Sequence, residues 1–415
     1  METTTSFDPE VLALPFYEDS HRRLAAQAGA WCDGNRMLWE EIRALDPDAA
    51  GRRLVGVLGA AGWLSELDPR GAPVDDFRAV CLRREALAYN EDLADFAFSV
   101  QALAATPLLR FGSEAQRRRY LPGMADGTLI GAFAVSEKEA GSDLASVGLE
   151  AVCGEDGSYV LNGRKAWIAN GTIADVFVVI ARTGHGPGPL GLSAFLVPAG
   201  TPGLRAERID AIAPRSFAHL SFQDCRLPAG AVLGRPGKGF VVAVDLLERF
   251  RTTVGAAALG FARRAFDTAL AHVLAREAYG GTLFDLQLVK ASLADMEVQL
   301  NAAALLVARA AWETDRGSRR FARHSNIAKV HATEAAQGVV DAAVQLLGAA
   351  GIVEGSVTER LYRQIRSLRI YEGTSEVLRM AIAGSLDMRR AARAAAPLRL
   401  PTSVARTNSS ARSTK

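Results

Sequence analysis

The chain has 415 residues, of which 49% are hydrophobic and 23% are charged, as in folded proteins of several domains. Because 48 Lys and Arg residues nearly balance 46 Asp and Glu residues, the net charge is only +2, which argues against a nucleic-acid partner. The cysteines show no CxxC spacing and no cluster with His, so we expect neither a metal site nor a disulfide scaffold; they are Cys32, Cys81, Cys153 and Cys225.

The start of the chain and its hydropathy bear on where the protein works. The first residues, METTTSFDPEV, are polar and acidic and lack the basic and apolar regions of a signal peptide. No apolar run approaches the roughly 20 residues of a membrane span. We therefore expect a cytoplasmic protein with no membrane partner.

Residues 1–125 form the first predicted domain, which is α-helical. Apolar residues recur at spacings of three and four in residues 21–45 and 75–112, with few helix breakers inside. The Pro122-Gly123 pair predicts a turn that closes this domain.

Residues 126–232 form the second predicted domain, a small β-barrel or sandwich. Short β-rich runs such as LIGAFAV, SYVLNGRKAWIA and ADVFVVIART alternate with turn residues. The Asn162-Gly163 pair between alternating residues predicts a type I′ hairpin. A GxGxxG match at residues 186–191 contains two prolines and opens no helix, so we interpret it as a loop.

Residues 233–390 form the third predicted domain, a four-helix bundle built on Ala and Leu. Residues 391–415 are predicted to be a disordered tail, since the stretch from Arg389 to Lys415 has seven basic residues and no acid. Helices, strands and helices thus follow one another as separate blocks. This order predicts an α+β multidomain protein and disfavours a Rossmann sheet.

Two segments carry candidate functional residues. In LRIYEGTSEVLRM, residues 368–380, Glu372 follows an apolar run and is expected to be partly buried. Burying a carboxylate is costly unless it is paired or protonated, although a solvated turn acid is the simpler interpretation in isolation. In residues 131–147, Ser136, Gly141 and Ser142 offer hydroxyl and backbone donors for a large cofactor, and Trp167 could line the same face.

Several motifs follow one another in the order and spacing of the acyl-CoA dehydrogenase family, and the chain resembles this family over nearly its whole length. They are AFAVSEKEAGSD, LNGRKAWIANG, REAYG, LADM, AVQLLGAAG and YEGTSEV. The resemblance implies the three domains above and an FAD cofactor. It further implies oxidation of an acyl thioester, on CoA or acyl carrier protein, to the trans-2-enoyl thioester. An electron-transferring flavoprotein as acceptor and a homotetramer or homodimer are also implied.

The resemblance assigns the cofactor residues. Contacts to the flavin ring fall on Phe133, Val135, Ser136, Trp167 and Ala169, followed by the turn that holds Gly141 and Ser142. Residues near other parts of FAD, or facing it, are Arg276, Tyr279, Gln287, Gln345, Gly348, Thr374 and Glu376. Arg276 and Tyr279 match residues that reach the FAD of a neighbouring subunit. Without the resemblance, we would interpret Arg276 as a surface arginine and Gln345 as part of the polar face of a helix.

Glu372 falls on the catalytic base of the family. It would remove the α-proton while hydride leaves the β-carbon for flavin N5, and burial would raise its pKa from ~4.3 and strengthen it as a base. The Glu372 N–H and a flavin ribitol hydroxyl would polarise the thioester carbonyl. The substrate-binding residues implied are Ser142, Glu248, Arg251, Tyr371 and Gly373. Some members place the base just before the matching arginine, where this chain has Phe250.

Four departures from the family pattern predict a divergent member that acts on an unusual acyl group or an acyl-carrier-protein thioester. They are Ala169 in place of Thr or Ser at flavin N5, the reduced turn 213–216, Gln364 in place of Asp, and Gly348-Ala349 in place of Gly-Gly.

Two other functions compete with this one. A flavin oxidase or monooxygenase on the same fold, acting on a non-thioester substrate, is disfavoured by Glu372, but Ala169 leaves room for it. A catalytically inactive acyl-thioester-binding protein is disfavoured by the intact Glu372, Arg276 and Gln345.

Overall fold

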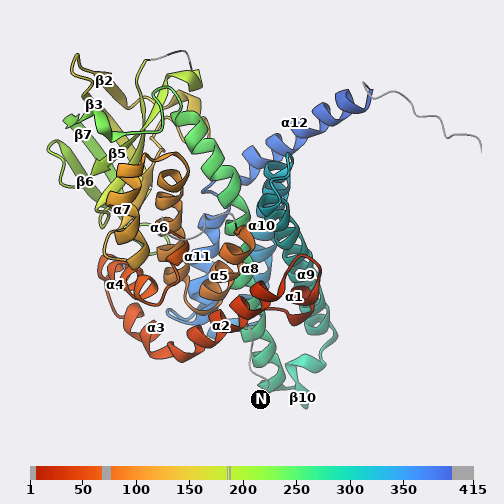
Figure 1. Cartoon of the computed structure of the whole chain (residues 1–415). Coiled ribbons are helices and arrows are strands. Elements are labelled where there is room, and N and C mark those ends of the chain that lie inside the picture. Colours follow the sequence, from red (N-terminus) through yellow and green to blue (C-terminus); the bar gives the residue numbers. More distant parts are fainter. Residues whose placement is uncertain (1–5, 68–75, 185, 187, 395–415) are drawn as a thin grey trace, which may run out of the picture.

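The structure is a computed structural model that describes residues 6–67, 76–184, 186 and 188–394. A block of helices, a β-sheet and a second block of helices follow one another along the chain (Figure 1). This is the predicted fold class.

The N-terminal block is helical in its described residues, from Pro9 in α1 to Asp126 in α7. Its elements are α1 (Pro9–Ala13), α2 (Asp19–Gly34), α3 (Arg36–Arg43), α4 (Pro47–Ala60), η1 (Ser65–Leu67), α5 (Phe77–Asn90), α6 (Asp92–Phe111) and α7 (Glu114–Asp126). The turn predicted at Pro122-Gly123 is wrong, because α7 continues through both residues. Leu121 and Met124 are fully buried there, so core packing holds the helix until Gly127 ends it in the left-handed conformation at φ +79°.

The middle block is one eight-stranded sheet with the strand order β6-β7-β3-β2-β4-β5-β8, and β1 pairs in parallel with β4. The strands are β1 (Gly131–Ala134), β2 (Glu150–Cys153), β3 (Tyr159–Ala169), β4 (Val176–Arg182), β5 (Leu192–Pro198), β6 (Leu204–Ile209), β7 (Phe217–Leu227) and β8 (Val232–Leu233). The sheet curls around its own core. The rings of Tyr159 on β3 and Phe195 on β5 lie 4.9 Å apart, although two strands separate β3 from β5 in the order.

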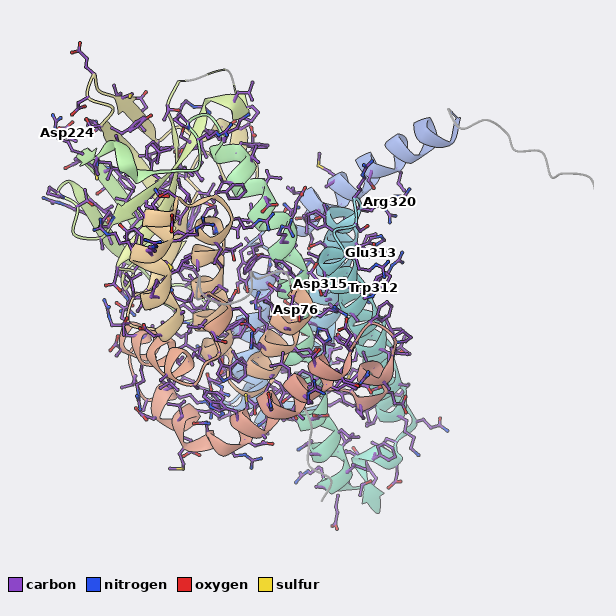
Figure 2. All side chains as sticks on the ribbon, in the orientation of Figure 1. Asp76, Asp224, Trp312, Glu313, Asp315 and Arg320 are labelled. Carbon is purple, nitrogen blue, oxygen red and sulfur yellow. The ribbon has the colours of Figure 1, made fainter. Side chains whose placement is uncertain are left out.

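The hairpin predicted at Asn162-Gly163 is wrong, since β3 runs straight through both residues and pairs with β7. A β-bulge lies at this point of the β3–β7 pairing, and Gly163 has φ +139°. A Cβ on Gly163 would lie 2.9 Å from Leu149 Cδ1, so the glycine serves a close approach. The Asn162 side chain accepts a hydrogen bond from the backbone N–H of Asp224 at 2.8 Å, near the tip of the sheet (Figure 2).

The C-terminal block contains α8 (Gly239–Ala275), the hairpin β9 (Glu277–Ala278) and β10 (Gly281–Thr282), η5 (Leu283–Asp285), α9 (Gln287–Asp315), α10 (Phe321–Leu347), η6 (Gly348–Ile352), α11 (Val357–Leu368) and α12 (Ser375–Ala394). Helices α8 to α11 pack together as a bundle, and α12 projects away from it (Figure 1). Since α12 ends at Ala394, the first residues of the predicted tail are helical. Residues 395–415 lie outside the described residues.

Helix α8 connects the three blocks. It has 37 residues and is therefore about 55 Å long. At its start a Cβ on Gly239 would lie 2.5 Å from the Ser193 backbone of β5, and its middle packs on α5. At the end of α9, Asp315 accepts hydrogen bonds from the Phe77 backbone N–H and from Arg78 Nε, both at 2.6 Å (Figure 2). The start of α5 is thereby fixed to the bundle.

The segment Phe321–Ile352, which is α10 with η6, is long and apolar enough to cross a membrane by length and composition, with a mean hydropathy of 1.3. Bundle helices that never enter a membrane meet the same two criteria. This segment, found in the part of the chain that the structure describes, is therefore only weak evidence for a membrane span.

Candidate active site

Glu372 lies in the short loop that joins α11 to α12, and its backbone is held in an unusual conformation. Its φ is +54°, which is uncommon for a residue other than glycine, and Gly373 follows with φ +100°. Two positively charged side chains donate hydrogen bonds to backbone carbonyls of this loop. Arg251 Nε on α8 donates to the Glu372 carbonyl at 3.0 Å, and Lys329 Nζ on α10 donates to the Gly373 carbonyl at 2.7 Å. The bundle therefore dictates the shape of the loop.

The Glu372 side chain is half-buried, and one of its two carboxyl oxygens is enclosed. Its Oε2 atom is enclosed and has no hydrogen-bond partner among the described residues. Burial raises the pKa of Glu372 to about 7, although the positive charges of Arg84, Lys329 and Arg251 act in the opposite direction. A carboxyl whose pKa lies near neutrality is suited to act as a general base. The direction agrees with the expectation from the sequence.

Lys329 and Arg251 are themselves removed from water. Lys329 is fully buried, and burial lowers its pKa to about 8 despite the nearby Glu372 carboxylate. Arg251 is partly buried and also donates from Nη1 to Asn326 Oδ1 at 3.0 Å. Glu248 lies one helical turn before Arg251, and burial raises its pKa. Of the predicted substrate residues, Arg251 thus meets Gly373 at this loop, and Glu248 lies one helical turn away from Arg251.

The residues on either side of Glu372 tie the loop to its helices. Tyr371 packs against the main core, and burial raises its pKa. The hydroxyl of Thr374 accepts a hydrogen bond from the Val377 N–H at 3.3 Å and so caps the start of α12. Glu376, in the first turn of α12, is exposed. Of these two predicted cofactor residues, Thr374 therefore caps a helix and Glu376 faces solvent.

A second group of predicted residues comes together where β1 and β3 end. The Ala166 N–H donates to the Ser136 carbonyl at 2.9 Å, which sets the two segments side by side. Phe133 and Val135 are buried, whereas Ser136 and Ala169 are half-buried. Trp167 has φ +57° and is 53% exposed, so its ring is not a core element. Gly141 and Ser142 are exposed in the loop that follows.

This second group fits the flavin that the sequence predicts. A planar ring system needs an apolar surface together with hydrogen-bond donors at its polar edge, as flavin and other cofactor sites provide. Here the exposed indole of Trp167 follows Ala166, whose N–H donates to the Ser136 carbonyl, so the indole and the serine belong to adjoining segments. These are the donor types and the apolar face that such a group requires.

A buried ion pair that the sequence analysis missed supports the second group. Lys165 is fully buried and donates to Glu137 Oε1 at 2.7 Å and to the Val135 carbonyl at 2.9 Å. Glu137 also accepts the N–H groups of Gly148 and Leu149. The pair fixes the loop after β1. An alternating strand pattern gives no signal for a lysine that points inward.

The remaining predicted cofactor residues lie elsewhere in the chain. Arg276, Tyr279 and Gln287 are exposed at the far end of α8 and in the turn into α9, at the opposite end from the sheet (Figure 1). Tyr279 is 92% exposed. Gln345 and Gly348 are exposed at the end of α10. The single chain does not bring Arg276, Tyr279 and Gln287 to Trp167, and their role across a subunit boundary stays a prediction.

Two of the departures from the family pattern contact each other. Arg215, in the shortened turn after β6, is 5% exposed and donates from Nη2 to Gln364 Oε1 on α11. Its guanidinium also lies 4.3 Å from the centre of the Phe96 ring and 3.9 Å from Asp92 on α6. Gln364, which replaces the Asp of the family pattern, is therefore the residue that accepts the hydrogen bond of Arg215. The two differences form one local change.

Three further charged residues around Glu372 were not predicted: Arg84, Asp95 and Lys329. Arg84 lies on α5 and Asp95 on α6, two helices with mostly buried residues, and both side chains are almost fully buried. Charges within a fully buried helix are the signal that was available, since such residues are rarely buried unpaired.

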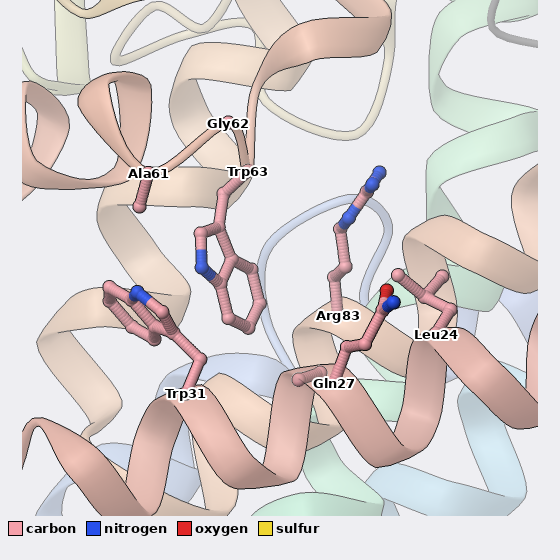
Figure 3. A pocket seen from close by; sticks show the side chains of 8 residues that line it. Leu24, Gln27, Trp31, Ala61, Gly62, Trp63 and Arg83 are labelled. Carbon is pink, nitrogen blue, oxygen red and sulfur yellow. The ribbon is translucent and has the colours of Figure 1, made fainter.

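One pocket among the described residues lies away from the predicted site residues. This pocket of about 190 Å³ lies between α2, the end of α4 and α5 and is lined by Trp31, Trp63, Gln27 and Arg83, among others (Figure 3). None of the predicted site residues lines it. Among the described residues there is also no group of three or more His, Cys, Asp or Glu side chains that could hold a metal ion.

Comparison with known proteins identifies the family. The models of the N-terminal, middle and C-terminal domains of acyl-CoA dehydrogenase match residues 19–128, 132–225 and 237–386. The human mitochondrial short-chain specific acyl-CoA dehydrogenase is 42% identical over 283 residues, which are 68% of each chain.

Solved structures agree with this match. The butyryl-CoA dehydrogenase of Megasphaera elsdenii superposes with a TM-score of 0.81 at 32% identity, over 89% of this chain and 98% of that one. The prolyl acyl carrier protein oxidase AnaB superposes with a TM-score of 0.82 at 26% identity, over 89% and 99%. The chain therefore belongs to the acyl-CoA dehydrogenase family, is an oxidoreductase that acts on CH–CH bonds, and uses FAD as its cofactor.

Proposed function

We propose that the protein introduces an α,β double bond into an acyl thioester, with Glu372 as the base that removes the α-proton. The observation that carries this proposal is a carboxyl with an enclosed, unpartnered oxygen and a pKa raised to about 7, in the loop to which the resemblance assigns the base. Bound FAD supplies the acceptor for the hydride that leaves the β-carbon.

The residues of the chain have separate roles in this proposal. The Glu372 carboxylate takes the α-proton, and its burial strengthens it as a base. Arg251 and Lys329 fix the loop carbonyls, and the Glu372 N–H would donate to the thioester oxygen as charge develops on it. Trp167 and Ser136 would hold the flavin ring.

The function is tested by anaerobic bleaching of the bound flavin with acyl thioesters. Wild-type protein should bleach within seconds, and Glu372→Gln, which keeps the shape but cannot take a proton, should lose at least ~10³-fold in rate. Arg118→Leu serves as a control, since Arg118 forms an exposed pair with Glu114 on α7. A Glu372→Gln protein that bleached as fast as the wild type would overturn the role of Glu372.

The acyl group and its carrier are addressed by the same assay. One relative is specific for short chains, and one structural neighbour is an oxidase of prolyl acyl carrier protein. The four departures from the family pattern lead us to propose an unusual acyl group or a carrier-protein thioester. A higher kcat/KM for ordinary short- or medium-chain acyl-CoA than for any other thioester in the panel would contradict this.

We propose an electron-transferring flavoprotein as the electron acceptor. The alternative, an oxidase or monooxygenase that passes electrons to oxygen, rests on Ala169, which supplies no hydroxyl to the flavin. Stopped-flow reoxidation separates the two. Reoxidation by air that is faster than reoxidation by an electron-transferring flavoprotein would favour the oxidase.

We also propose a homotetramer or homodimer, in which Arg276 and Tyr279 reach the cofactor of the neighbouring subunit. Large apolar side chains exposed on this part of the single chain support the proposal, among them Leu274, Leu288 and Val298. Light scattering of the FAD-bound protein should give a multiple of the 44.2 kDa chain mass, and a monomer that retains FAD would exclude the shared site.

A cytoplasmic location is proposed on the basis of the cysteines. All four are free, which suits a reducing compartment. Secretion of a tagged full-length protein from its native host would contradict this location.

A further inference from the structure

A second buried ion pair lies beside the Glu372 loop. Arg84 on α5 is 1% exposed and Asp95 on α6 is 2% exposed. The guanidinium binds the carboxylate through two hydrogen bonds, from Nε to Oδ1 at 2.8 Å and from Nη2 to Oδ2 at 2.9 Å. Such a pair is costly to bury, and apolar residues of similar size usually stabilise a fold as well or better. Its presence near the base calls for a function.

A third hydrogen bond places Arg84 against the active-site turn of α8. Arg84 Nη1 donates to Thr253 Oγ1 at 2.9 Å. Thr253 follows Arg251 by two residues, and Arg251 holds the Glu372 carbonyl. The guanidinium is therefore fixed on the same part of α8 that positions the base. Because Arg84 and Asp95 are buried and Glu372 is half-buried, water screens their charges less than it would at the surface.

We propose that the Arg84–Asp95 pair is a positioning element that tunes the protonation of Glu372, with Arg84 stabilising the carboxylate and Asp95 limiting that stabilisation. The inference rests on the proposed role of Glu372 as the base. Neither residue touches the substrate in this proposal, and both act through the charge they place near Glu372.

The charged and titratable groups that face Glu372 come from every element around it. They are Arg84 on α5, Asp95 on α6, Arg251 on α8, Lys329 on α10 and Tyr371 in its own loop. Among the charges that lower the pKa of Glu372, Arg84 acts most strongly, and Asp95 raises this pKa. Arg251 and Lys329 are already engaged with the loop carbonyls. The pair is thus the part of the environment that can change the charge at Glu372 without releasing the loop.

Two variants should shift the titration of Glu372 in opposite directions. Asp95→Asn keeps Arg84 charged and removes the opposing charge, so the midpoint should fall by about one pH unit. Arg84→Met combined with Asp95→Leu removes both charges and leaves no buried ion unpaired, so the midpoint should rise, because the effect of Arg84 is the larger. A merely structural role predicts no such reversal of sign.

The matched control is the neighbouring pair of Glu85 on α5 and Arg263 on α8, whose atoms lie 2.8 Å apart. It also starts from α5, next to Arg84, and Glu85 is buried, but neither residue is among the main charges that act on Glu372. The double variant Glu85→Leu and Arg263→Met should therefore leave the titration of Glu372 unchanged.

The measurement is an infrared pH titration of the Glu372 carboxyl in the FAD-bound enzyme, identified by subtraction of Glu372→Gln. It needs no turnover, so it tests the charge coupling even if the enzyme acts on another substrate. The pH profile of anaerobic flavin reduction should shift by the same amount as the infrared midpoint. Midpoints that stay at the wild-type value, or move in the same direction in both variants, would overturn the proposal.

Discussion

At the scale of single residues, Glu372 combines two features that each destabilise the fold. One oxygen of its half-buried carboxyl is enclosed without a partner among the described residues, and its backbone has a positive φ. The hydrogen bonds of Arg251 and Lys329 to the loop carbonyls offset part of this cost. Sites of this kind, strained and poorly satisfied but held by their surroundings, are typical of catalysis.

The pKa of Glu372 leads to a prediction about stability. The unfolded carboxyl titrates near pH ~4.3, whereas the folded one titrates at about 7, so the folded state binds the extra proton between these values. Wild-type stability should therefore fall as the pH rises through this window. Because Gln carries no charge, Glu372→Gln should gain on the wild type by up to about 3 kcal/mol between about pH 5 and pH 8.

This prediction is checked by urea denaturation of both proteins at several pH values. The difference in the free energy of unfolding between variant and wild type should grow with pH and then level off above pH ~8. A difference that stays constant over the whole range would mean that the Glu372 pKa is not raised in the fold.

The sequence led to Glu372 because its motif is local, with the acid, the flanking aromatic and the Gly-Thr pair all adjacent in the chain. It did not lead to the Arg84–Asp95 pair. These residues lie on two different helices, and their contact depends on how α5 and α6 cross, which helical periodicity does not fix. The sequence did not predict the role of Lys165 for the same reason, because its partner Glu137 lies in the loop after β1, far from β3 in the chain.

At the scale of elements, the blocks of helix and strand were predictable from periodicity, but two turns were not. Pro122-Gly123 and Asn162-Gly163 both have local turn chemistry, and both lie inside longer elements. Buried residues on either side hold α7 through the first pair. Pairing of β3 with β7 carries the strand through the second. Tertiary packing therefore overrode a local preference in each case.

The crossing of α5 and α8 gives a prediction at this scale. A Cβ on Gly260 would lie 2.4 Å from the Glu85 carbonyl oxygen and 2.9 Å from Ala88 Cβ. Gly260→Ala should thus force the helices apart and destabilise the protein by about 1–3 kcal/mol, more than the gain in helix propensity. Gly29→Ala in α2, where the added methyl meets no atom within 4 Å, should be neutral or slightly stabilising.

Thermal unfolding of the two alanine variants beside the wild type measures this effect. If Gly260→Ala unfolded at the same temperature as Gly29→Ala, the close approach of α5 and α8 would not exist in solution. Because Arg84 lies on α5 and Thr253 on α8, the same variant should also disturb the hydrogen bond between them.

At the scale of the whole molecule, Arg215 joins the three blocks at one point. It belongs to the turn after β6, its amide partner Gln364 lies on α11, and its other neighbours Phe96 and Asp92 lie on α6. Ser216, the next residue, donates to the Pro47 carbonyl at the start of α4. The shortened turn therefore forms a junction of sheet, N-terminal helices and bundle. In the sequence alone, the reduced turn 213–216 and Gln364 are two unrelated departures from the family pattern.

Loss of this junction should weaken the cooperation between the blocks. Arg215→Leu leaves the buried Asp92 without the nearby guanidinium and removes the contact with the Phe96 ring, so unfolding should become easier by about 3 kcal/mol. Arg118→Leu, at the exposed pair on α7, should change stability by no more than about 0.5 kcal/mol. Chemical denaturation followed by both tryptophan fluorescence and circular dichroism measures the loss. Four of the five tryptophans lie in the N-terminal block or at its boundary with the bundle, so fluorescence reports mainly on that block. If the fluorescence and circular dichroism curves separate in Arg215→Leu alone, the blocks unfold independently in that variant. Identical stability of the two variants would refute the junction.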